Sequence, residues 1–114
     1  MDSTSQAPRE DLLASFFRIF PGFQDHWHLD REDEEWPSTS LHSVYLSFLP
    51  YVSAANPSQK QLKHLAVLVD RAVSMGGDSE NAVSTCFLEH LGQTGLLRAL
   101  RPLLNPEARS RLMA

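Results

Sequence analysis

The chain has 114 residues, of which 42% are hydrophobic and 21% are charged, and its formal net charge at pH 7 is −4. This length is typical of one domain, and this composition supports a packed core rather than intrinsic disorder. The negative charge argues against nonspecific binding to nucleic acid, because phosphate contacts need clustered Lys and Arg.

The cysteine content and the N-terminal sequence indicate a compartment. Cys86 is the single cysteine, so no disulfide can form within the chain and a stapled secreted mini-domain is excluded. The N-terminal segment has neither the basic region nor the apolar region of a signal peptide. The apolar runs are much shorter than the ~20 residues that a membrane-spanning helix needs. We therefore expect a cytoplasmic protein that does not enter a membrane.

The first two predicted helices cover about 8–20 and 23–31. In the first, acidic residues favour the positive end of the helix dipole, the apolar residues form one stripe, and Pro21-Gly22 ends the helix. The acidic run Asp30–Glu35 follows. We predict a loop in this run, because its carboxylates repel one another.

A third helix is predicted to begin with Ser38 or Thr39 as its N-cap, and apolar residues at helical spacing then continue to Val52. Pro50 lies inside this pattern. Because proline removes a backbone donor and clashes with the carbonyl group four residues earlier, we expect a kink or an early end of the helix there.

The clearest helical pattern covers 58–75. Its apolar residues occupy about half of the helix circumference, which predicts contact with more than one neighbouring helix. Gly76-Gly77 then ends this helix. Three further helical segments are predicted: 79–91 with Asp78 or Ser79 as N-cap, 94–104, and a last turn or two beginning at Asn105-Pro106-Glu107.

These patterns predict an all-α fold of five to six helices. No segment keeps the apolar–polar alternation of a strand, and the short connections predict antiparallel helical hairpins. We expect a flexible N-terminus over 1–7 and a single helical domain over 8–114.

Two groups of side chains are candidates for chemistry. His26 and Asp30 have helical i, i+4 spacing and provide two metal ligands, but a stable site needs three or four, and His28 points away from His26. Cys86 and His90 are also four apart, as in a thiolate–imidazolium pair. Since no orienting group is assignable, the favoured interpretation is a buried cysteine beside a core histidine. We expect no catalytic residue, no metal and no cofactor.

Charge is unevenly distributed along the chain. The acidic run holds Asp30, Glu32, Asp33, Glu34 and Glu35, and Trp36 follows it, whereas Arg98, Arg101, Arg109 and Arg111 form the basic patch. The acidic run is a candidate surface for a basic partner. The arginines are a candidate for phosphate or an acidic partner. Trp27 and Trp36, flanked by charge, are candidates for lining a groove.

The segment Gly77–Leu91 resembles a motif of small bacterial all-helical proteins of unknown function, in which a glycine–acid turn precedes a helix reading Asn-Ala-Val-x-Thr-x-Phe-Leu-Glu-x-Leu. The resemblance implies an α–α superhelix of the armadillo/HEAT kind and no established activity. It places the chain near contact-dependent toxin–immunity systems. It also implies that Asn81, Thr85 and Glu89, a polar ridge at i, i+4 and i+8, contact a partner or tie their helix to its neighbour.

The sequence therefore favours a protein-binding module, of an inhibitor or immunity type, that acts as a monomer or weak homodimer on an unknown protein partner. Two alternatives stay open. One is a metal- or thiol-dependent enzyme that uses Cys86 and His90. The other is a nucleic-acid accessory protein that uses the C-terminal arginines, although the net charge makes nucleic acid an improbable partner.

Overall fold

The computed structural model describes residues 7–32 and 40–112, and within them every regular element is a helix. The all-α class is therefore confirmed. None of the helices in these two ranges is both long and apolar enough to cross a membrane. The α-helices are α1 (Ala7–Ile19), α2 (Phe23–Glu32), α3 (Leu41–Ala55), α4 (Gln59–Met75), α5 (Gly77–Cys86), α6 (Leu96–Leu100) and α7 (Pro106–Arg109), and the 3₁₀ helices are η2 (Leu88–Gln93) and η3 (Arg101–Leu103).

Helices α1 and α2 lie as predicted, except that α1 runs over 7–19. The predicted flexible segment 1–7 lies outside the described residues apart from Ala7, which belongs to α1. An aromatic cluster joins this helix pair to α3. The rings of Phe16 and Phe48 stack with centroids 3.9 Å apart, and Phe23 packs edge-on against both. All three side chains are fully buried, so this cluster anchors the N-terminal half of the core.

Helix α3 differs from its prediction at two points. Its N-cap is Ser40, whose hydroxyl accepts a hydrogen bond from the Ser43 amide at 3.2 Å, and not Ser38 or Thr39. The helix also continues through Pro50 to Ala55, so the predicted early end is wrong. Pro50 lies on the exposed side of α3, where solvent can satisfy the carbonyl group that loses its helical partner.

Helix α4 confirms its prediction. Ser58 forms a capping box with Gln61, in which each side chain bonds the backbone N–H of the other residue. The Gln61 side chain also donates to the carbonyl of Ile19 at 2.9 Å, which fastens the start of α4 to the end of α1.

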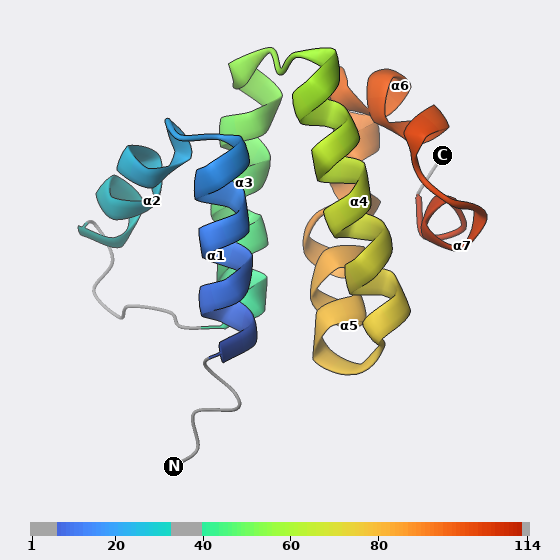
Figure 1. The fold of residues 1–114 in the computed structure, drawn as a ribbon, viewed down its shortest axis with the longest axis horizontal. Coiled ribbons are helices and arrows are strands. Elements are labelled where there is room, and N and C mark those ends of the chain that lie inside the picture. Colours follow the sequence, from blue (N-terminus) through green and yellow to red (C-terminus); the bar gives the residue numbers. More distant parts are fainter. Residues whose placement is uncertain (1–6, 33–39, 113–114) are drawn as a thin grey trace.

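Helix α5 occupies the centre of the packing. It lies against both α3 and α4, whereas α3 and α4 themselves are not a closely packed pair. Figure 1 shows α3 and α4 meeting at the end where they are joined. The predicted packing of successive helices as hairpins therefore describes α4 and α5 better than α3 and α4. The armadillo/HEAT-like superhelix stays a prediction.

The C-terminal third is more broken than predicted. The predicted helix 79–91 is wrong, because α5 ends at Cys86 and a 3₁₀ helix follows. The predicted helix 94–104 is likewise divided between α6 and η3. The last turn begins as expected: the Asn105 side chain caps α7 by accepting from the Ala108 amide at 2.8 Å, and the Asn105 amide donates to Asp70 on α4 at 3.0 Å.

Candidate functional site

The predicted acidic surface is mostly outside the described residues. Helix α2 extends to Glu32, so the predicted loop is wrong for its first residues, Asp30 to Glu32. Asp33, Glu34, Glu35 and Trp36 lie outside the described ranges, and their candidate role stays a prediction. Trp27, by contrast, is buried beside Phe23 in the core and lines neither of the two hollows described below.

The predicted polar ridge does not form along one helix. Asn81 and Thr85 lie on α5, but Glu89 lies on η2 beyond the helix end, so i, i+8 spacing no longer places it above them. The Asn81 amide nitrogen lies 3.3 Å from Nε2 of His42 on α3. The Thr85 hydroxyl donates to the Asn81 carbonyl at 2.8 Å. Asn81 therefore ties α5 to α3, which is one of the two roles that the resemblance implies.

The two candidate chemical pairs are not supported by the geometry. Cys86 is buried at the last residue of α5, and His90 lies on the following 3₁₀ helix, so the two do not share a helix face. His26 stacks against Phe23 with centroids 5.9 Å apart, whereas His28 is exposed. Across residues 7–32 and 40–112, no three His, Cys, Asp or Glu side chains are placed to hold one metal ion.

An apolar groove opens between α1, α3, α4 and α5, and we call it the Tyr45 groove. Its volume is about 470 Å³, within the range of ~300–1,000 Å³ typical of ligand sites. Its described lining is mainly apolar, from Leu12, Leu41, Tyr45, Leu68, Ala72 and Met75, together with Asp11, Ser15, Arg71 and Ser79. These residues come from the N-terminal parts of α1, α3 and α5 and from the C-terminal half of α4. In Figure 1 these parts of the helices lie away from the α3–α4 connection, so the groove that their side chains line lies away from it as well.

Tyr45 supplies the most distinctive group in this groove. Tyr45 is only 3% exposed, and the exposed part includes its hydroxyl, which forms no hydrogen bond with the described residues and meets solvent in the groove. Burial raises the pKa of Tyr45 well above its ordinary value, because the phenolate would lose its hydration. The ring packs against Phe16 and Phe87 with centroids 5.9 Å and 6.0 Å away. A neutral hydroxyl, held in place by its ring, is therefore presented at the base of the groove.

The rim of the Tyr45 groove combines an exposed apolar side chain with two opposite charges. Met75, the last residue of α4, is 63% exposed. Asp11 on α1 and Arg71 on α4 are exposed as well, and among the described residues no ion pair is formed by either of them. An apolar recess with a few polar groups at its edge can hold an apolar body and fix its orientation.

Sequence reasoning missed the groove and placed only part of its lining on apolar helix faces, namely Leu12, Leu41, Tyr45, Leu68 and Ala72. The available signal was the breadth of the apolar face of α4, which predicted more than one neighbouring helix. In the structure, part of that face packs against α5 and part, at Leu68 and Ala72, lines the groove. The periodicity does not indicate which part of the apolar face of α4 is left uncovered by neighbouring helices.

Comparison with known proteins adds no functional evidence, since no family model, no curated protein and no solved structure matches this chain. The similarity to small bacterial helical proteins therefore stays a proposal.

Proposed function

We propose that this domain is a protein-binding module whose Tyr45 groove receives a large side chain from a partner protein. The observation that carries the proposal is the hydroxyl of the nearly buried Tyr45, which meets solvent at the base of a mainly apolar groove. A polar group without a partner destabilises the folded state unless water or a ligand bonds it. Because water meets this hydroxyl in the free protein, a bound partner that displaces the water must supply a hydrogen bond in its place.

The chemistry of the groove favours an aromatic occupant with a polar end. Tyr and Trp bury large apolar surfaces, carry one hydrogen-bonding group, and are enriched among the residues that dominate binding energy at interfaces. Either one places its ring against Leu68 and Met75 and directs its O–H or N–H toward Tyr45. Asp11 and Arg71 at the rim then select the charges that flank the aromatic residue.

An enzymatic function has less support. Cys86 is buried and does not share a helix face with His90, and the Tyr45 groove holds no nucleophile–base pair among its described lining. An inhibitor or immunity role is a form that such a binding module takes, and the resemblance of Gly77–Leu91 is its only support.

The test is selection of binders from a random peptide library displayed on phage, followed by affinity measurements on two α4 variants. Met75→Lys places a charge at the groove rim, and Val67→Lys is its matched control. Val67 is 54% exposed on the same helix but does not line the groove. Both positions tolerate lysine, since both are more than half exposed.

We expect the selected peptides to share a Trp or Tyr and to lose about fivefold or more in affinity for Met75→Lys, because rim contacts exclude water from the central residue. Val67→Lys should change affinity by less than about twofold, in line with surface positions outside a contact. Equal effects of the two variants, or a selected consensus without an aromatic residue, would refute the proposal.

A further inference from the structure

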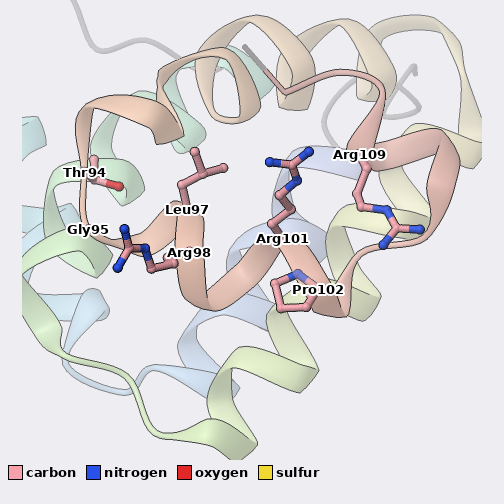
Figure 2. A pocket seen from close by; sticks show the side chains of 7 residues that line it. All are labelled: Thr94, Gly95, Leu97, Arg98, Arg101, Pro102 and Arg109. Atoms are coloured by element: carbon pink, nitrogen blue, oxygen red, sulfur yellow. The ribbon is translucent and has the colours of Figure 1, made fainter. Parts of the chain in front are cut away.

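Three arginines surround a second hollow on the surface of the C-terminal third, which we call the arginine depression. Arg98 on α6, Arg101 on η3 and Arg109 on α7 line it, and its volume is about 740 Å³ (Figure 2). All three side chains are exposed, and among the described residues none of them forms an ion pair. This hollow lies on elements that the Tyr45 groove does not use.

The fourth C-terminal arginine has ion-pair partners, whereas the other three have none among the described residues. Arg111 is half-buried and forms ion pairs with Glu80 on α5 and, at 4.0 Å, with Glu107 on α7. The Glu80 pair fastens the C-terminal segment to α5, whereas the Glu107 pair lies within that segment. The sequence grouped four arginines in one patch, whereas the structure divides them into one structural residue and three that face solvent.

The other residues of the depression add apolar surface rather than acceptors. The Thr94 hydroxyl donates to the Leu91 carbonyl at 2.9 Å and accepts from the Leu96 amide at 3.1 Å, so it is already engaged. Leu97 and Pro102 contribute carbon atoms between the arginines (Figure 2). A ligand must therefore supply hydrogen-bond acceptors and some apolar surface of its own.

We infer that the arginine depression binds an acidic peptide segment of a partner protein, with carboxylates on the guanidinium groups and an apolar side chain against Leu97 and Pro102. Guanidinium groups bind carboxylates through paired N–H donors. Figure 2 shows Arg98 on one side of Leu97 and Arg101 with Arg109 on the other. Because the three guanidinium groups point in different directions in Figure 2, an extended acidic chain suits them better than one small anion.

A nucleic acid fits the same hollow less well. The described lining contains no aromatic side chain on which a base can stack. The whole chain carries −4, so without these three arginines the remainder carries −4 − 3 = −7 and repels a long polyanion. A short acidic peptide contacts only the depression and avoids most of that repulsion.

The test measures binding of an array of acidic heptapeptides, with and without leucine, to the intact protein and to two charge-reversal variants. Arg101→Glu alters the depression. Arg18→Glu is the matched control, because Arg18 is an exposed arginine on α1 and its reversal changes the net charge by the same amount. A single-stranded oligonucleotide of equal charge serves as the competing probe, and circular dichroism checks that both variants are folded.

We expect leucine-containing acidic peptides to bind, Arg101→Glu to weaken them by about tenfold, and Arg18→Glu to weaken them by less than about twofold, with affinity falling as salt is raised. Met75→Lys should leave this binding unchanged, which separates this inference from the function proposed for the Tyr45 groove. The inference is overturned if no peptide binds, if the two charge reversals have equal effects, or if the oligonucleotide binds more tightly than the peptides.

Discussion

Replacing Tyr45 by phenylalanine tests the central feature of the proposed binding groove. The substitution keeps the ring and its contacts with Phe16 and Phe87, and it removes only the hydroxyl. At neutral pH, a buried hydroxyl without a partner costs roughly 1–3 kcal/mol of folding free energy. Because this hydroxyl faces a groove that water can enter, we expect a smaller gain for Tyr45→Phe, of about 0–1 kcal/mol.

The same substitution has a larger expected effect in alkaline solution. Burial raises the pKa of Tyr45 in the folded protein above the value near 10 of an exposed tyrosine. Above about pH 10 the unfolded chain therefore releases a proton that the folded chain keeps, so stability falls as pH rises. One such proton corresponds to a slope of about 1.4 kcal/mol per pH unit. Tyr45→Phe lacks this proton and should lose stability more slowly than the wild type.

The assay is urea denaturation followed by circular dichroism, at about pH 7 and about pH 11, for the wild type, Tyr45→Phe and Tyr51→Phe. Tyr51 lies on the same helix but is only half-buried, so it controls for the loss of a phenol. Taking differences from the wild type cancels the other groups that titrate in this range. A loss of more than about 1 kcal/mol for Tyr45→Phe at pH 7 would mean that the hydroxyl has a partner, and the reasoning about the groove would be wrong.

Two further substitutions test the core and a turn. Phe48→Ala should lower the free energy of unfolding by about 3–5 kcal/mol in urea denaturation, because Phe48 is fully buried. Its control is Leu46→Ala, at a side chain 55% exposed, which should cost less than about 1 kcal/mol. Similar losses for the two variants would contradict the described core. Gly76→Ala should cost about 1–3 kcal/mol by the same measurement, because Gly76 has φ of 70° and ψ of −168°, although no atom crowds the added methyl group. Gly95→Ala, at a φ of −76°, is its control, and an equal loss there would exclude a backbone cause.

The helices that the sequence predicts well are those for which several signals agree. For α4, the apolar period over 58–75 agrees with the Gly76-Gly77 stop, and the structure confirms both. At α3 the signals conflict, because Pro50 opposes the apolar pattern on either side of it. The pattern is the better guide here, since burial of Phe48 and Val52 stabilises the helix and Pro50 faces solvent.

The break after Cys86 follows from burial that one helix cannot provide. Cys86, Phe87 and Leu88 are all buried. Adjacent residues of an α-helix point about 100° apart, so three in succession cannot all face one side. A change of direction at Phe87, with φ of −131°, lets all three reach the core. Periodicity alone treats the region 79–91 as one amphipathic helix and misses this conflict.

Each of the two candidate sites combines residues that are far apart in the sequence. A local sequence pattern does not predict which distant residues meet. The Tyr45 groove joins Leu12, Tyr45 and Met75, which three separate helices bring together. For the arginine depression, the sequence predicted a basic patch but not which of its four arginines face solvent. Only the structure separates Arg111 from the others, because its partner Glu80 is 31 residues away.

The Tyr45 groove is also the place where two departures from ordinary folding preferences coincide. Phenylalanine at position 45 would pack the same ring without a hydroxyl that the described residues leave unbonded, and a charged residue at position 75 would suit an exposed helix end better than Met75 does. Neither Tyr45 nor Met75 therefore improves the fold. Departures of this kind concentrate at functional sites. If Tyr45→Phe raises stability and also weakens the peptides selected on the wild type, the hydroxyl is retained for binding at the expense of stability. If it raises stability and leaves those peptides bound equally well, the hydroxyl has no part in recognition and the groove must act through its shape alone.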